Sequence, residues 1–588
     1  MRKPASTITR KSGGVFLTEE RSNGNNRTRV ADPIRVRSIG TRLADKVTMV
    51  EIRFKTIHGD YRSEMFEFSY LHRERWDKIK VRVGDQGYEW PEDQKLANEI
   101  LRQLAAEHPK RRFFLVSAPG WYGSELVLRD KVFSPPGSGT DYRIDPKSPA
   151  HIGAFVCGKG SLEGWQEAVA KLARKSSCLR VAIAAAFAAP LVRPMAMDSF
   201  AINWFSRTSD GKTAMLFIAA SVAGLIGPRG LPGWADSEPG IEGQALGHRD
   251  SVLPLDETGD GNSKVSLKDK AKMLAFMIAR NRPRTLSANY ERANALQDRE
   301  YRIIAQSSSE LALSQVAIDA GGRRLGGEEV RFIDVPASEP GSLGIFDGRV
   351  KKLIGKTDQE TTKALIEKMR VYAEFNQGFA YHEFLDKYFR EAEALSKVRA
   401  YKDQFESQVS VPSSNAALRI RSNFALIWAA AAMAIDYEVL PWTKSPTFDA
   451  VEKCLRKALD VIEANKAPAS AVDATTSILM ALKDKLEKAD LRKVVLRKQI
   501  TQQQARRRAK ADGFRINGDI YLKPDRLRRW IPSNRDRVVL RDSGIFRTRR
   551  DDAATIEQVI AGIPGKPRYY VLDGGKLERL LRKKPSRT

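Results

Sequence analysis

The sequence predicts a multidomain α/β protein, and three features of its 588 residues lead to this prediction. An apolar run at residues 201–205 is followed by a Gly-Lys-Thr motif at residues 211–213 and then by an apolar helical run at residues 214–220. A second apolar run ends in an Asp-Glu pair at residues 256–257. The chain also carries a net charge of +28, and its C-terminal part is strongly basic. A chain of this length can hold three or four domains.

The N-terminal part is predicted to be a tail followed by a small domain. Residues 1–30 are polar and rich in Ser, Asn, Gly and Arg, so we expect a disordered basic arm. Residues 31–135 are predicted to form an α+β module. Apolar side chains alternate at residues 47–54 and 63–69 on either side of a turn, which predicts a hairpin, and residues 91–107 have helical periodicity.

Residues 150–345 are predicted to form a phosphate-binding core. The stretch from Ser206 to Thr213 follows the pattern of glycine, four free positions and Gly-Lys-Ser/Thr, except that Ser206 stands at the first glycine. Backbone N–H groups at such a helix start attract phosphate. Lys212 is expected to reach the β- and γ-phosphates, and the Thr213 hydroxyl is expected to ligate Mg²⁺. The alternative is a chance tripeptide in a turn that begins a helix.

The Asp-Glu pair is predicted to be the second half of this site. Asp256, at the end of a core strand, can hold the Mg²⁺ shell, and Glu257 can polarise an attacking water. The alternative is a helix N-cap pair that complements the helix dipole. Polar residues 307–310 follow a predicted strand at residues 302–306, and they are placed to sense a γ-phosphate or the water.

The C-terminal part is predicted to be helical and then basic. We expect a helical lid at residues 346–470, a charged helical linker at residues 471–510, and a basic winged-helix-like domain at residues 511–588. Residues 491–588 hold roughly 27 Lys and Arg against about 10 acids, which is typical of a nucleic-acid-binding domain. A charged face that only contacts solvent remains the alternative.

Composition argues against several classes of protein. Three widely spaced cysteines do not predict a disulfide framework or a zinc cluster, and the six histidines have no metal-ligand spacing. The N-terminal residues contain no apolar run of the kind that marks a signal peptide. The longest apolar stretches are shorter than the roughly 20 residues that span a bilayer. A cytoplasmic protein without a membrane partner is therefore expected.

Several segments, in this order, resemble a bacterial and phage family called domain of unknown function 927, which is described as helicase-like ATPases linked to mobile-element replication genes. The matching segments are residues 120–121 with 126–128, 160–165, 184–190, 208–213, 253–257, 307–310, 327–331, 421–426 and 440–442.

The resemblance implies an AAA+ or helicase-like P-loop ATPase core that uses ATP and Mg²⁺. It places ATP at Ser209, Asp210, Gly211, Lys212 and Thr213, the acidic pair at Asp256 and Glu257, and a sensor at Ser308. It makes Arg331 a candidate trans-acting finger and Arg421 a candidate sensor on the helical lid, and it implies a homo-oligomer in the form of a hexameric ring.

These expectations together predict an ATP-driven DNA helicase or translocase that acts in mobile-element or phage-related DNA processing. Two alternatives stay open. In one, the protein is a DNA-binding initiator or regulator that uses ATP only as a structural switch. In the other, the phosphate loop is inactive and the basic C-terminal part alone binds DNA.

Overall fold

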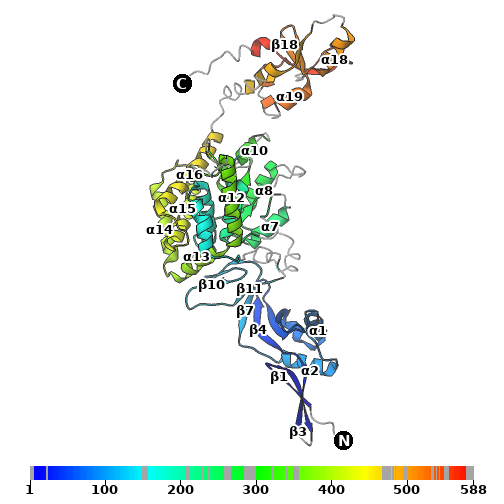
Figure 1. The fold of residues 1–588 in the computed structure, drawn as a ribbon, viewed down its shortest axis with the longest axis vertical. Coiled ribbons are helices and arrows are strands. Elements are labelled where there is room, and N and C mark those ends of the chain that lie inside the picture. Colours follow the sequence, from blue (N-terminus) through cyan, green and yellow to red (C-terminus); the bar gives the residue numbers. More distant parts are fainter. Residues whose placement is uncertain are drawn as a thin grey trace. The chain divides into compact units, whose positions relative to one another are not determined.

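A computed structural model describes most of the chain as two compact units. Unit 1 comprises residues 1–310 and 326–457, and unit 2 comprises residues 311–325 and 458–588 (Figure 1). The residues described are 6–21, 24–146, 148, 157–206, 211–226, 231–234, 237–256, 267–283, 300–319, 324, 326–339, 342, 344–347, 357–466, 478–479, 482–483, 485–494, 500–531, 536–537, 540–541, 543–547 and 555–577.

Unit 1 begins with a three-stranded antiparallel sheet of order β1-β2-β3, formed by β1 (Ser6–Lys11), β2 (Gly14–Arg21) and β3 (Gly24–Ala31). The prediction of a disordered arm at residues 1–30 is therefore wrong for these strands. Ile8 and Val15 are buried in the core of the following module, which explains why this polar segment is ordered. A few apolar side chains in this polar segment, Ile8, Val15 and Leu17, are enough to pack it on that core.

A mixed five-stranded sheet follows, with the order β11-β7-β4-β5-β6. The predicted hairpin is confirmed as β5 and β6, and the predicted helix is confirmed as α2. The sheet extends past residue 135, the expected end of the module, because β11 pairs in parallel with β7. The elements are β4 (Ile34–Arg42), β5 (Val47–Lys55), β6 (Tyr61–Glu67), α1 (Trp76–Gly84), α2 (Gln94–Ala105), β7 (Arg112–Val116) and β11 (Tyr142–Ile144).

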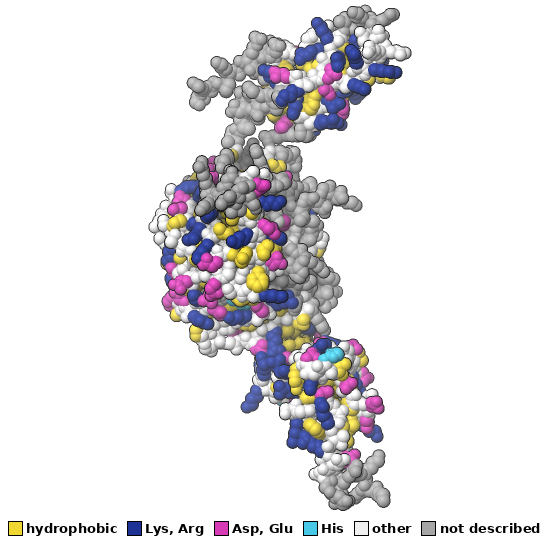
Figure 2. Space-filling model, viewed as in Figure 1, with side chains coloured by type: hydrophobic (Ala, Val, Ile, Leu, Met, Phe, Trp, Pro, Cys, Tyr) yellow, Lys and Arg dark blue, Asp and Glu magenta, His cyan; other side chains and the backbone are white. Residues whose placement is uncertain are grey.

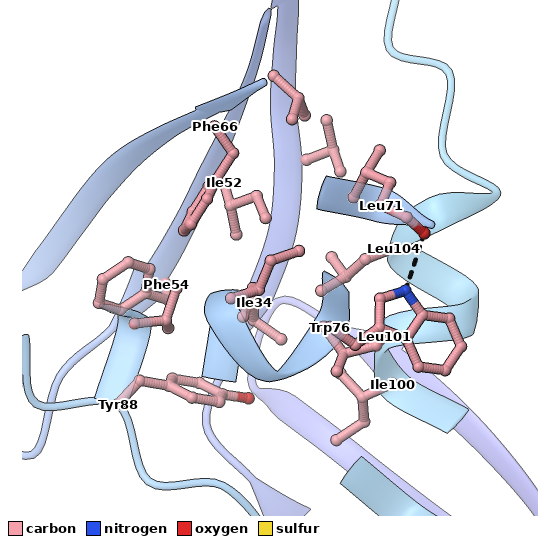
Figure 3. Close-up of a cluster of buried hydrophobic side chains, with 14 of the residues drawn as sticks. Ile34, Ile52, Phe54, Phe66, Leu71, Trp76, Tyr88, Ile100, Leu101 and Leu104 are labelled. Atoms are coloured by element: carbon pink, nitrogen blue, oxygen red, sulfur yellow. Dashed lines mark hydrogen bonds between the residues drawn. The ribbon is translucent and has the colours of Figure 1, made fainter. Parts of the chain in front are cut away.

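The core of this module lies between the sheet and the two helices (Figure 3). Ile52, Phe54 and Phe66 from the strands pack toward Ile100 and Leu104 of α2, and all five are fully buried. A small second sheet is inserted after β7, and it consists of β8 (Gly120–Tyr122), β9 (Glu125–Val127) and β10 (Val132–Phe133).

The centre of unit 1 is a four-stranded parallel sheet of order β13-β14-β12-β15. Its strands are almost continuous buried runs, as expected where both faces of a parallel sheet are covered. The strand predicted at residues 302–306 is confirmed as β14, but the three serines expected to follow it are part of the strand and are buried. The strands are β12 (Phe200–Phe205), β13 (Val252–Leu255), β14 (Ile304–Ser309) and β15 (Phe332–Pro336).

Helices cover this sheet. Helices α5 and α6 pack on each other and on β14, whereas α8 and α11 pack on each other and on β12. The helices of this layer are α3 (Leu162–Trp165), a π-helical turn (Gln166–Ala170), α4 (Lys171–Ala173), α5 (Ser177–Ala188), α6 (Lys212–Val222), α7 (Glu238–Gly247), α8 (Leu267–Arg280) and α11 (Gly326–Arg331).

The region expected to be a lid is helical. It packs on the core, since α12 contacts α6 and α15 contacts α5. By length and composition α15 could cross a membrane, but 72% of its apolar window is buried, as in the core helix of a globular protein. The helices are α12 (Asp358–Phe375), α13 (Phe379–Arg390), α14 (Ala394–Gln408), α15 (Asn415–Asp436) and α16 (Lys444–Lys466).

Unit 2 contains a five-stranded sheet of order β16-β17-β18-β20-β19. Asn517 and Gly518 have positive φ in the two-residue turn between β17 and β18, as an Asn-Gly hairpin requires. The elements are α10 (Leu313–Asp319), β16 (Leu491–Lys493), α18 (Gln502–Lys510), β17 (Gly513–Ile516), β18 (Asp519–Leu522), α19 (Pro524–Trp530), β19 (Ile556–Glu557) and β20 (Arg568–Leu572).

The prediction of a charged helical linker at residues 471–510 is wrong. Strand β16 interrupts it and pairs in parallel with β17. Leu482, Leu486 and Val494 are buried in the hydrophobic clusters of unit 2, so the segment belongs to this unit rather than connecting two domains. Whether residues 511–588 act as a winged helix stays a prediction.

Candidate functional site

The candidate site lies at the carboxyl edge of the parallel sheet. Strands β12, β13 and β14 all end at this edge, and the predicted site residues on them follow or close the strands. Loops at the carboxyl ends of parallel strands are where ligands bind in open α/β sheets. The fold therefore brings together segments that are about 50 residues apart in the sequence.

The Gly-Lys-Thr motif lies at the start of α6. Gly211 caps the start of α6 with φ of 96°, a left-handed conformation that favours glycine. A Cβ atom at this position would lie 2.5 Å from Cδ1 of Ile366 on α12. The Lys212 ammonium donates a hydrogen bond of 2.7 Å to the carbonyl oxygen of Ser206, across the loop that joins the two.

Asp256 is the meeting point of the other side chains. Its Oδ1 accepts a hydrogen bond of 3.1 Å from the Thr213 hydroxyl and one of 2.5 Å from the Ser308 hydroxyl. Ser308 is almost completely buried, whereas Thr213 is exposed and Asp256 is half-buried. The side-chain oxygens of Thr213, Asp256 and Ser308 therefore lie together at the carboxyl ends of β13 and β14.

Buried polar residues beneath the site hold these strand ends in register. The Asn203 amide donates to Ser309 Oγ at 2.8 Å and to Asp334 Oδ1 at 2.7 Å, so it connects β12 with both neighbouring strands. The Trp234 indole donates a hydrogen bond of 2.8 Å to Ser307 Oγ. The backbone N–H of Trp234 also donates to the carbonyl oxygen of Asp256 at 3.0 Å, which fixes the end of β13.

The donor set fits the ligands expected from the sequence. A hydroxyl and a carboxylate are hard oxygen ligands of the kind that Mg²⁺ takes together with phosphate oxygens. The Thr213 hydroxyl oxygen and Asp256 Oδ1 are joined by a hydrogen bond, so these two possible ligand atoms are already next to each other. Ser209, Asp210 and Glu257 lie outside the described residues.

Two predicted arginines lie elsewhere. Arg331 ends α11 just before β15, at the amino ends of the strands, roughly 16 Å along the strand from the site by the usual rise per residue. Arg421 lies on α15, where its guanidinium donates to the Val409 carbonyl at 3.3 Å. Of the predicted residues described here, the site therefore unites Gly211, Lys212, Thr213, Asp256 and Ser308 and leaves both arginines outside.

Sequence reasoning did not identify Asn203, Asp334 or Trp234. Asn203 was concealed inside an apolar run, and a single polar residue in a buried strand was the available signal. Trp234 lies in a segment rich in glycine and proline, where no periodicity marks a residue that packs inward.

Comparisons with known proteins agree with this architecture. Residues 8–297 match the model of the family described as a domain of unknown function (DUF927). A solved structure titled "SCCmec type IV Cch - active helicase" covers 99% of this chain and 100% of that chain, with a TM-score of 0.56 and 14% identity. At this identity the likeness shows a shared fold. The comparison with curated proteins finds no match.

Proposed function

Over residues 8–297 the chain belongs to the DUF927 family, and on this premise we propose that the protein is an ATP-dependent DNA motor of the helicase or translocase kind. The helicase title of the structural neighbour and the family's association with mobile elements support DNA processing in such an element as its setting. We further propose that it works as a homo-oligomeric ring in the cytoplasm.

One observation carries this proposal. The Thr213 and Ser308 hydroxyls both donate to Oδ1 of Asp256, beside a left-handed glycine and a lysine that begin α6. A core carboxylate joined in this way to the first turn of a phosphate-binding helix is the arrangement that phosphoryl transfer to water uses.

Each residue has an assigned role. Lys212 would give up its hydrogen bond to the Ser206 carbonyl and bind phosphate oxygens instead. Thr213 and Asp256 would hold Mg²⁺, which would neutralise charge on the phosphates. Ser308 orients the Asp256 carboxylate through its short hydrogen bond. Glu257 is assigned the positioning of the attacking water. Arg331 is assigned a role in trans, and Arg421 a sensor role on the helical region.

Unit 2 is proposed to bind DNA. Lys and Arg side chains are numerous on the visible face of this unit (Figure 2). Helix α18 presents Arg506, Arg507 and Lys510 as exposed cations. Such clustering provides contacts with phosphates and a salt-dependent affinity.

The test is an ATPase assay without DNA, with single-stranded DNA and with double-stranded DNA. We expect DNA to stimulate hydrolysis by wild-type protein, and we expect Lys212→Ala and Glu257→Gln each to reduce the rate at least a hundredfold. Lys95→Ala, which changes an exposed lysine of α2, is the matched control and should leave the rate unchanged.

The same assay separates the alternatives. A protein that uses ATP as a switch would bind Mg-ATP and raise its melting temperature, yet DNA would not increase its turnover. An inactive phosphate loop would give neither hydrolysis nor thermal stabilisation by millimolar Mg-ATP. Either result would contradict the motor proposal.

A further inference from the structure

A second cluster of chemically active side chains lies away from the candidate ATPase site. Asp130 follows β9, Cys157 precedes α3, and His382 lies on α13, so three separate segments converge. Cys157 Sγ lies 3.3 Å from His382 Nδ1, and the opposite ring nitrogen, Nε2, lies 3.4 Å from Asp130 Oδ2. All three side chains are at least partly exposed to solvent.

The imidazole is held in one orientation. The ring of Phe133 packs edge-on against His382, with ring centroids 5.5 Å apart. Asp130 occupies Nε2 and Cys157 occupies Nδ1, so each ring nitrogen has one partner. An acid that orients an imidazole, which in turn accepts a proton from a thiol, is the arrangement that activates cysteine nucleophiles.

We propose that Cys157 is a nucleophilic thiol, activated by His382 and Asp130, and that it is a site of covalent modification by low-molecular-weight disulfides. The Cys157 proton passes to His382 Nδ1, and Sγ attacks one sulfur of the disulfide. An S–S bond forms to Cys157 as the S–S bond of the small molecule breaks. The departing thiolate takes the proton back from His382, so one thiol and one disulfide give another thiol and another disulfide, and the imidazole returns to its starting state.

The electrostatics around the imidazole support this geometry. Burial lowers the pKa of His382, but the contacts with Asp130 and Cys157 outweigh it and raise the pKa to about 9. Burial raises the pKa of Asp130, but the contact with His382 outweighs it and lowers that pKa. Lys131 also lowers the pKa of Asp130. The Lys131 ammonium itself forms an ion pair with Asp386 of α13, with Nζ 2.7 Å from Oδ2.

A metal site is the competing interpretation, since the three ligand atoms lie within 4.8 Å of one another. The geometry disfavours it. Asp130 and Cys157 engage opposite nitrogens of one ring, so an ion at Nδ1 would have two protein ligands among these three residues, with Asp130 behind the ring. Catalytic zinc sites use three protein ligands.

The chain supplies internal controls. Cys178 and Cys454 are free thiols that are completely buried. Peptide mass spectrometry can therefore compare an activated thiol with two inaccessible ones in a single full-length protein. The proposal does not depend on ATP hydrolysis, so an inactive phosphate loop would leave it standing.

The experiment measures the rate of alkylation by iodoacetamide at Cys157 in the full chain between pH 5.5 and 9. We expect a rate that changes little below pH 8, because the proton lies on the imidazole, whereas an ordinary thiol slows about tenfold per pH unit. His382→Gln and Asp130→Asn should each slow Cys157 at least tenfold at pH 6.5. Asp386→Asn, which removes the neighbouring carboxylate of α13, should leave the rate within twofold.

Two further measurements complete the test. Incubation with glutathione disulfide should place one adduct on Cys157 and none on Cys178 or Cys454. An ordinary pH profile in the wild type, or an unchanged rate in a folded His382→Gln variant, would overturn the proposal. If the protein retained one Zn²⁺ per chain and this ion blocked alkylation of Cys157, the cluster would be a metal site and the thiol proposal would be wrong. Circular dichroism and a thermal melt establish that each variant is folded. If His382→Gln does not fold, the alkylation rate of the conservative Asp130→Asn variant decides the test.

Discussion

The Thr213 hydroxyl donates a hydrogen bond of 3.1 Å to Oδ1 of Asp256, and this contact joins the first turn of α6 to the end of β13. Both residues precede β14 in the sequence, but in the sheet β14 lies between β13 and β12, the strand that leads into α6. The contact therefore spans one strand, and Ser308 of that intervening strand donates to the same oxygen.

Gly211→Ala is expected to damage the phosphate loop. A non-glycine residue at φ of 96° costs about 1–2 kcal/mol, and its Cβ would contact Ile366. We expect a lower melting temperature and no further rise on addition of Mg-ATP.

The matched control for this change is Gly243→Ala on α7, where a Cβ meets nothing within 4 Å. Alanine in that helix should be neutral or stabilising by up to about 1 kcal/mol. Adding Ile366→Ala to Gly211→Ala should remove the steric contact and leave the backbone strain. Full recovery in the double variant would show that the backbone conformation of Gly211 is unimportant.

Ser308→Ala is expected to weaken the candidate site by freeing a partly buried carboxylate. Loss of a hydrogen bond to a charged group costs about 1–3 kcal/mol, and we expect this loss in the free energy of unfolding together with a lower ATPase rate. Combining Ser308→Ala with Asp256→Asn in a double-mutant cycle should give a coupling energy above about 0.5 kcal/mol. Ser396→Ala on α14, whose exposed hydroxyl donates to Glu393, should show no coupling to Asp256→Asn.

Arg506→Ala combined with Arg507→Ala is expected to weaken DNA binding through the phosphate backbone. Each lost phosphate contact should reduce the slope of log affinity against log salt by about 0.9 for duplex DNA. Fluorescence anisotropy between 50 and 300 mM salt measures this slope. Arg102→Ala on α2, whose side chain is 70% exposed, is the control that should leave it unchanged, and an unaltered slope in the α18 variant would remove that helix from the interface.

His248 is expected to make the protein less stable in acid. Burial lowers the pKa of His248 to about 4, against a smaller opposing effect of its bond to the Gln244 carbonyl. The unfolded chain binds this proton below about pH 6.5 and the folded chain does not, so stability falls as the pH drops from about 6.5 to about 4. The loss is on the order of 3 kcal/mol.

His248→Gln should flatten this part of the pH dependence, as measured by urea denaturation at several pH values. His72→Gln, at an exposed position, should not. A wild-type stability that is constant between pH 6.5 and 4.5 would contradict the assignment.

Much of the candidate site could be predicted from the sequence because its signals are local. A buried strand, a glycine that begins a helix, and a second strand with an acid at its end each leave a short pattern, and Lys212, Thr213 and Asp256 became candidates on these patterns. Ser308 was also identified, although it lies inside β14 rather than beyond its end. Hydrogen bonds satisfy its hydroxyl, and composition alone cannot show that.

The errors share one cause, which is tertiary contact overriding local composition. Residues 1–30 were predicted to be disordered because they are polar, yet Val15 is completely buried against the neighbouring module. The charged segment at residues 471–510 reads as one helix, yet Leu491 is in a strand that pairs with β17. Asn203 and Trp234 were missed because their partners lie far along the chain.

The N-terminal sheet has a consequence for how the protein behaves at high concentration. Strand β3 is the last strand of its sheet, so its outer N–H and C=O groups can template the addition of another chain. Arg27 and Arg29 lie on this strand, and pairing with a second copy would bring like charges to about 5 Å. These two side chains would keep concentrated molecules from joining edge to edge, so replacing them with uncharged residues should favour inclusion bodies during expression.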